Sequence, residues 1–145
     1  MNISIKHFNE LTVKELFEIY KVRTKIFVVE QNCPYQEVDD TDKISYHIWL
    51  GNNDDIKSYL RLFMCDEKSK TAAIGRVLST ERRHGYASVI ISECIKFAKK
   101  TLYAKRLVLD AQAYAGALYL NLGFRQISDE FLIDGIPHIK MEMKF

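Results

Sequence analysis

A predicted strand end meets a predicted helix start in the stretch Val77-Leu78-Ser79-Thr80-Glu81-Arg82-Arg83-His84-Gly85-Tyr86-Ala87. The first amides of a helix have no acceptor within the helix and carry partial positive charge, so they can bind an anion. Gly85 lets the backbone approach closely, and Arg82, Arg83 and His84 can add contacts from their side chains. Taken alone, the pattern fits either a phosphate site or a solvated basic turn.

The segments around this turn alternate between strand and helix patterns. Strand patterns cover residues 3–8, 46–50, 56–64, 71–78 and 106–111, and a hairpin joins 131–133 to 136–145. Helical patterns cover residues 12–28, 85–100 and 113–122. Turn chemistry between Glu30 and Asp42 predicts a long loop. The order of these elements predicts one α/β (α+β) domain, residues 1–145, around a central sheet with a three-stranded antiparallel meander.

The bulk properties exclude several classes of protein. The longest apolar runs are far shorter than a membrane span, and Lys6, His7 and Glu10 interrupt the N-terminus, so we expect a cytoplasmic protein without membrane contact. With 21 Lys plus Arg and 19 Asp plus Glu, the net charge of +2 gives no support for a nucleic-acid partner. Three widely spaced cysteines match no zinc or redox motif. We therefore expect reduced thiols and no metal.

Two motifs give the chain a family resemblance. The pattern Arg82-x-x-Gly85-x-Ala87 resembles the Gln/Arg-x-x-Gly-x-Gly/Ala signature of the GNAT acyltransferases, and Val77 stands where that family has a strand residue whose backbone meets pantetheine. The stretch 115–124 is similar to the second signature, a helix with a tyrosine four residues before Gly-Phe. Further segments, 27–36, 39–42, His47 and 134–139, resemble the ElaA-like branch of this superfamily.

The resemblance implies a mixed, mostly antiparallel sheet flanked by helices, whose central strands splay to form a cleft for acyl-coenzyme A. It implies acetyl-coenzyme A as co-substrate. The cofactor-binding positions that it implies are Val77, Arg82, Arg83, His84, Gly85, Tyr86, Ala87, Ser88, Gln112 and Tyr119. Some positions depart from the common pattern: Ala87 and Ser88 replace frequent glycines, Ser79 a frequent proline, and Gln112 a frequent asparagine. Ala87 is an accepted variant, so cofactor binding remains the expectation.

Tyr119 is the predicted catalytic acid. By its position in the family motif, it would protonate the departing coenzyme A sulfur, while the Val77 amide would polarise the thioester carbonyl. The alternative is a core tyrosine, because Leu118 and Leu122 lie in the same helical segment.

The general base is less clear from the sequence. Glu30, His138 and His47 are candidates, in that order, and Glu30, Gln31, His47 and His138 are also the predicted acceptor-binding residues. Glu30 can equally be an exposed charge at a helix end, and a lone strand histidine is often structural. The acidic segment 39–42 is either a rim near the acceptor site or a solvated loop.

These features predict an N-acetyltransferase that moves an acetyl group from acetyl-coenzyme A to a primary amine in a ternary complex. The amine would belong to a small molecule, a lysine or a protein N-terminus. The alternative is a module of the same fold that binds acyl-coenzyme A as a sensor without turnover. The sequence leaves the acceptor, the acyl-chain preference and the choice between monomer and homodimer open.

Overall fold

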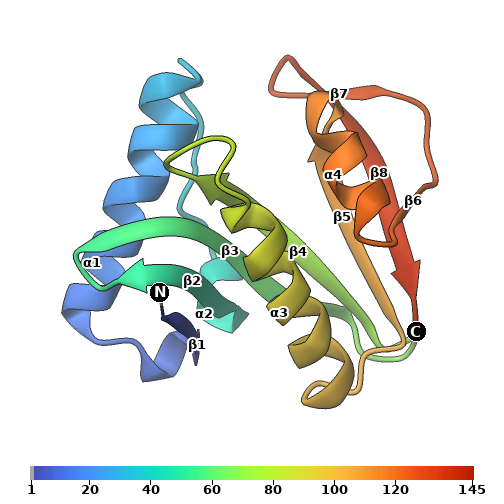
Figure 1. The fold of residues 1–145 in the computed structure, drawn as a ribbon, viewed down its shortest axis with the longest axis horizontal. Helices are drawn as coiled ribbons and strands as arrows, with labels where there is room; N and C mark the ends of the chain where they lie inside the picture. The colour runs from blue at the N-terminus through green and yellow to red at the C-terminus, as the bar shows by residue number, and fades with distance from the viewer. Residues whose placement is uncertain (1) are drawn as a thin grey trace.

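The structure, a computed structural model that describes residues 2–145, is built on one mixed sheet (Figure 1). Its strands are β1 (Ile3–His7), β2 (Tyr46–Asn52), β3 (Asp55–Asp66), β4 (Thr71–Ser79), β5 (Arg106–Gln112), β6 (Arg125–Gln126), β7 (Phe131–Ile133) and β8 (Ile136–Lys144). The spatial order is β1-β2-β3-β4-β5-β8-β6, with β7 also beside β8. Only β4 and β5 pair in parallel in this part of the chain. The predicted mixed, mostly antiparallel sheet is confirmed.

The helices pack on this sheet. They are α1 (Val13–Arg23), α2 (Thr41–Ile44), α3 (Tyr86–Lys100) and α4 (Gly116–Asn121), with 3-10 turns at η1 (Phe8–Glu10) and η3 (Ala113–Ala115). The helix predicted over 12–28 is not uniform, because α1 continues after Arg23 as a π-helical segment, η2 (Thr24–Glu30). None of the helices within residues 2–145 is long and apolar enough to cross a membrane.

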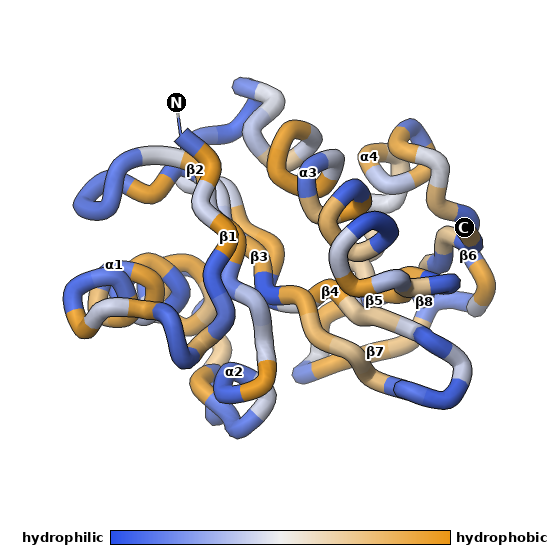
Figure 2. The backbone as a smooth tube through the Cα atoms, turned by 90° about the horizontal axis from the view of Figure 1, so that it is seen from below, coloured by the Kyte–Doolittle hydropathy of each residue, from blue (hydrophilic) through white to orange (hydrophobic). Residues whose placement is uncertain are grey.

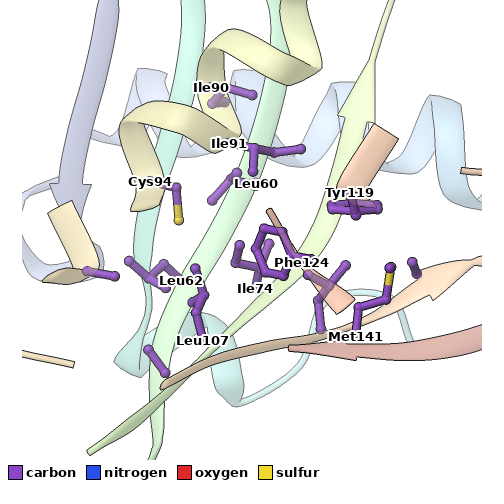
Figure 3. Packing of buried hydrophobic residues seen from close by; sticks show 14 of the residues in the cluster. Leu60, Leu62, Ile74, Ile90, Ile91, Cys94, Leu107, Tyr119, Phe124 and Met141 are labelled. Carbon is purple, nitrogen blue, oxygen red and sulfur yellow. The ribbon is translucent and has the colours of Figure 1, made fainter. Parts of the chain in front are cut away.

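Apolar side chains fill both faces of the sheet. Successive strand residues point to opposite faces, so Ile48 belongs to the core under α3 and α4, whereas its neighbour Trp49 packs with α1. Figure 2 shows hydrophobic residues gathered in the central strands and in α3, with hydrophilic residues mostly in the loops. In Figure 3, Ile90, Ile91 and Cys94 of α3 project toward the strands of this core. The larger core thus lies between the sheet and the α3–α4 layer.

A buried ionic network lies on the face toward α1. The fully buried guanidinium of Arg23 donates from Nη1 to Asp42 Oδ1 at 2.7 Å and from Nε to Glu37 Oε1 at 2.8 Å. Arg61 of β3 shares Asp42, with Nη1 3.0 Å from Oδ1. The Tyr59 hydroxyl lies 3.4 Å from Arg23 Nη1. Charges at this depth are tolerated because each is paired and hydrogen-bonded.

The network fixes the 31–40 loop, which connects η2 to α2. Asp39 accepts from Arg61 Nη1 at 2.7 Å, and Arg76 of β4 donates from Nη2 to the Glu37 carbonyl at 2.8 Å. The predicted acidic rim or solvated loop at 39–42 is wrong for Asp42, whose carboxylate is buried. The side chain of Asp39 is 36% exposed and paired with arginines, and Asp40 is largely exposed and paired with Lys43.

Replacing Arg23 by methionine should destabilise the fold strongly. The change keeps an unbranched side chain but leaves Asp42 and Glu37 without their main partner, a loss of about 3–5 kcal/mol in the free energy of unfolding. Urea denaturation followed by circular dichroism measures it. Lys43→Met is the matched control, because Lys43 pairs with Asp40 at the exposed surface and its loss should cost about 0–1 kcal/mol. Equal midpoints for the two variants would contradict the assignment.

The fold should also lose stability in acid through Asp42. Burial alone would raise the pKa of this carboxyl, but hydrogen bonds and charge from Arg23 and Arg61 outweigh it and hold the pKa below its usual value. A carboxyl with a depressed pKa contributes stability that is complete above its unfolded pKa, about 3.9, and disappears as pH falls through the lower folded value. We expect the urea midpoint of the wild type to fall steeply below about pH 4. Asp42→Asn should flatten that dependence.

Candidate functional site

The central strands β4 and β5 part at one end of the sheet. Their parallel pairing runs only from Thr71 opposite Arg106 to Ile74 opposite Leu109. Beyond this point β4 stays with β3 as far as Ser79, and β5 stays with β8 as far as Gln112. Figure 1 shows the two strands diverging toward the ends that precede α3 and α4. The predicted splay of the central strands is confirmed.

The diverging half of β4 carries a bulge. Tyr59 pairs with Leu78 and Arg61 with Gly75, so Leu60 lies opposite two residues of β4, Arg76 and Val77. Bulges of this kind interrupt the ladder and redirect the strand. Val77, a predicted cofactor contact, is half-buried at this point, on the side where β5 has moved away.

The predicted anion-binding turn, residues 80–85, follows β4 and leads into α3. Gly85 is the N-cap of α3 and has a φ of +72°, in the left-handed region that favours glycine. A Cβ at this position would meet no atom within 4 Å, so the requirement for glycine comes from the backbone. Arg82, Arg83 and His84 are all exposed. Glu81 anchors the turn to β3 through Lys57 Nζ at 2.7 Å.

The amino-terminal end of α3 has the properties of an anion site. Its first hydrogen bond within the helix runs from Val89 N to Gly85 O, so the amides of residues 86–88 have no acceptor in the helix. Among the described residues no side chain caps this end, and its first turn contains no acidic residue. Tyr86, Ala87 and Ser88 are half-buried, with the Tyr86 ring stacked 5.3 Å from that of His84. The free amides and the arginines before them together fit a phosphate group.

Tyr119 lies in α4 on the other side of the parting strands. It is only 4% exposed and packs edge-on against Phe124, with ring centroids 5.7 Å apart. Burial, reinforced by nearby Tyr114, raises the pKa of its hydroxyl well above the ordinary value for tyrosine. Figure 3 shows the ring at the edge of the apolar cluster near Phe124. The phenol is thus protonated at neutral pH and can donate its proton.

His138 and Gln112 face each other across β5 and β8. They are partners in the register, and Phe131 of β7 lies on the other side of His138. His138 Nδ1 lies 2.7 Å from the Ile136 carbonyl. Because a carbonyl only accepts, Nδ1 carries the proton, and Nε2 of the neutral ring is the nitrogen able to take up another.

The predicted acceptor residues Glu30 and Gln31 stand at the end of η2. Glu30 is exposed, and Gln31 caps the segment in a half-buried position. Two residues later, Cys33 Sγ lies 4.0 Å from the Asp134 carbonyl. The start of the 31–40 loop therefore touches the β7–β8 turn, four residues before His138.

The prediction that His47 contacts an acceptor or acts as base is wrong. Its side chain is fully buried, with Nδ1 2.7 Å from the Tyr59 hydroxyl and Nε2 3.0 Å from the Asp42 carbonyl. Burial lowers the pKa of the ring, which keeps it neutral. Both nitrogens are occupied by the ionic network, so His47 belongs to the packing of the 31–40 loop.

Sequence reasoning missed Arg61, Arg76 and Glu37. The signal was present in the strands, since Arg61 interrupts the apolar run 59–63 and Arg76 the apolar run 72–78. A charged residue inside an otherwise buried strand needs a buried partner. The partners lie in a segment that sequence patterns identify only as a loop.

Comparison with known proteins agrees with this geometry. Residues 18–145 match the family described as acetyltransferase (GNAT) domain. The chain belongs to the GNAT family. A UPF0039 protein of Schizosaccharomyces pombe is 42% identical over 143 residues, covering 96% of this chain and 94% of its own.

Two solved structures show the GNAT fold over nearly the whole chain. The crystal structure of Escherichia coli ElaA superposes with a TM-score of 0.91 at 31% identity, covering 99% of each chain. A crystal structure of an acyl-CoA N-acyltransferase from Pseudomonas aeruginosa gives a TM-score of 0.88 at 34% identity, covering 98% of this chain and 99% of the other. The expected resemblance to GNAT proteins of the ElaA-like branch is confirmed. Membership of this family implies binding of acyl-coenzyme A.

Proposed function

We propose that this GNAT protein is an N-acetyltransferase that moves an acetyl group from acetyl-coenzyme A directly to a primary amine bound beside it. The observation that carries the proposal is the parting of β4 and β5 after Ile74 and Leu109, directly ahead of an uncapped helix amino-terminus. The gap in strand pairing exposes backbone groups to a ligand, and the helix end supplies a site for that ligand's phosphates.

The pyrophosphate of the cofactor would lie at the start of α3. The amides of Tyr86, Ala87 and Ser88 point along the helix axis, and the exposed Arg82 and Arg83 stand beside them. His84 is also exposed, 3.6 Å from Glu81, and can turn toward the same anion. Gln112, at the end of β5, lies where the pantetheine arm would pass between the strands.

Chemistry would take place between Val77 and Tyr119. The Val77 amide stabilises the charge that develops on the thioester carbonyl oxygen as the amine attacks carbon. Tyr119 gives its proton to the sulfur as the carbon–sulfur bond breaks, so coenzyme A leaves as the thiol. The phenol is protonated at neutral pH, so its proton is present when negative charge develops on the sulfur.

The amine would enter between the 31–40 loop and the β7–β8 turn. Glu30 and Gln31 on one side and His138 on the other provide groups that hold a cationic amine and accept its proton. His138 Nε2 would accept the proton of the amine, and the Glu30 carboxylate would serve as counter-ion for an ammonium group. The acceptor is a small amine, an exposed lysine or a protein N-terminus.

Calorimetric titration of acetyl-coenzyme A tests the cofactor site. The double variant Arg82→Ala/Gly85→Glu removes one cation and adds one anion beside the phosphates, so affinity should fall by at least about tenfold, the loss of roughly one charge-assisted contact. Lys96→Glu makes the same charge change on the exposed side of α3 and should bind normally. Within residues 2–145, Lys96 pairs only with Glu93. Equal affinity in the double variant would remove this turn from the site.

Release of free thiol across a panel of amines tests the acid. Tyr119→Phe should lower kcat by about 10²- to 10⁴-fold, the usual contribution of a positioned general acid, without weakening acetyl-coenzyme A binding. Tyr103→Phe is the control, because Tyr103 is 75% exposed. Unchanged release of free thiol in Tyr119→Phe would show that Tyr119 only packs in the core and is not the catalytic acid. Binding of acetyl-coenzyme A with no release on any amine would favour a sensor module over an enzyme.

The pH profile gives a second check on the same residue. The protonated phenol is the active form and burial raises its pKa, so ionisation of Tyr119 should cause no loss of kcat until well above about pH 10. An alkaline loss near pH 9 that disappears in Tyr119→Phe would show that the hydroxyl is not held in this state.

A further inference from the structure

Arg76 occupies an unfavourable backbone conformation inside the β4 bulge. Its φ is +55°, in the left-handed region where a residue with a side chain is disfavoured. It shares the position opposite Leu60 with Val77, so the conformation of Arg76 determines how the strand enters Val77. Contacts elsewhere must hold the backbone in this state.

The guanidinium of Arg76 supplies those contacts. Nη2 donates to the Glu37 carbonyl at 2.8 Å and lies 3.4 Å from Asp39 Oδ2, while Nε lies 3.1 Å from Glu37 Oε1. The group also sits over the Tyr35 ring, 5.5 Å from its centroid. All of these partners belong to the 31–40 loop. The side chain therefore ties the bulge to one loop through several directed contacts.

That loop is itself held to the sheet and to α1. Arg23 Nε donates to Glu37 Oε1 at 2.8 Å, and Arg61 Nη1 donates to Asp39 Oδ1 at 2.7 Å. The position of the Arg76 guanidinium is thus set by two other arginines through shared carboxylates. Because the 31–40 loop holds the Arg76 guanidinium, it also restrains the backbone of the β4 bulge at the other end of that side chain.

We propose that Arg76 is a positioning residue for the reaction: it holds the bulge so that the Val77 amide faces the thioester carbonyl. The inference rests on the proposed function, in which Val77 supplies that amide. Arg76 acts through the backbone and touches neither substrate. The loop that it holds begins directly after Glu30, a residue of the proposed acceptor side.

Arg76→Asn tests the proposal in turnover. Asparagine tolerates the left-handed conformation but lacks the guanidinium. The control, Lys70→Asn, also replaces a cationic residue by asparagine at a positive φ, +54°. Lys70 is exposed and, among the described residues, pairs only with Glu67. We expect Arg76→Asn to lower kcat at least about tenfold, with KM and acetyl-coenzyme A affinity within about twofold, because a small misplacement of a reacting group slows chemistry while binding remains. Arg76→Lys should recover part of the loss. Lys70→Asn should match wild type.

The Val77 amide gives a readout that does not need turnover. In protein labelled with ¹⁵N-valine, its resonance should move in Asp39→Asn, which removes a charged partner of the guanidinium without changing the residue that precedes Val77, and should stay in place in Lys70→Asn. An unmoved Val77 resonance in Asp39→Asn, a wild-type kcat in Arg76→Asn, or an equal loss of kcat in Arg76→Asn and Lys70→Asn would overturn the proposal. Absence of thiol release by the wild-type protein with every amine would instead defeat the proposed function. The Val77 resonance would then decide the positioning role alone.

Discussion

The structure depends on the pairing of Arg23 with Asp42 and Glu37 beneath α1. Burying the Arg23 guanidinium without partners would cost more free energy than the fold can offset. The helix α1, the 31–40 loop and α2 must therefore come together for any of them to be stable there. Arg61 extends the same requirement to β3 by sharing Asp42. Directional ionic contacts thus determine the path of a loop that has no regular structure of its own.

The network also explains why the two halves of the proposed site differ. The cofactor half needs only what a strand, a glycine turn and a helix end supply, namely free amides and nearby cations. The proposed acceptor half comprises the end of η2, the 31–40 loop and the β7–β8 turn. The ionic network holds the loop, and Cys33 of the loop contacts Asp134 of the turn. A π-helical segment at η2 fits this position, since such segments are rare and often occur at functional sites.

Sequence patterns predicted the features that depend on neighbours along the chain. The strand, turn and helix around Gly85, the meander and the final hairpin were all predicted, because each follows from local periodicity or turn chemistry. The network joins residues 14 to 39 positions apart, and no spacing identifies such pairs. The prediction for His47 was wrong for the same reason. The sequence does not show that the imidazole of His47 is hydrogen-bonded to the Tyr59 hydroxyl.

The two faces of the sheet differ in how many substitutions they tolerate. Apolar packing under α3 and α4 has no direction, so volume-conserving exchanges there keep the cofactor side intact. On the α1 face Glu37, Asp39 and Asp42 each pair with two arginines, so removing any one of these groups weakens the pairing of two other charges. On the proposed acceptor side, Glu30 and Gln31 lie outside the network, so exchanges there leave its charges paired. Such exchanges also leave Arg76 tied to Glu37 and Asp39, and with it the backbone that leads into Val77.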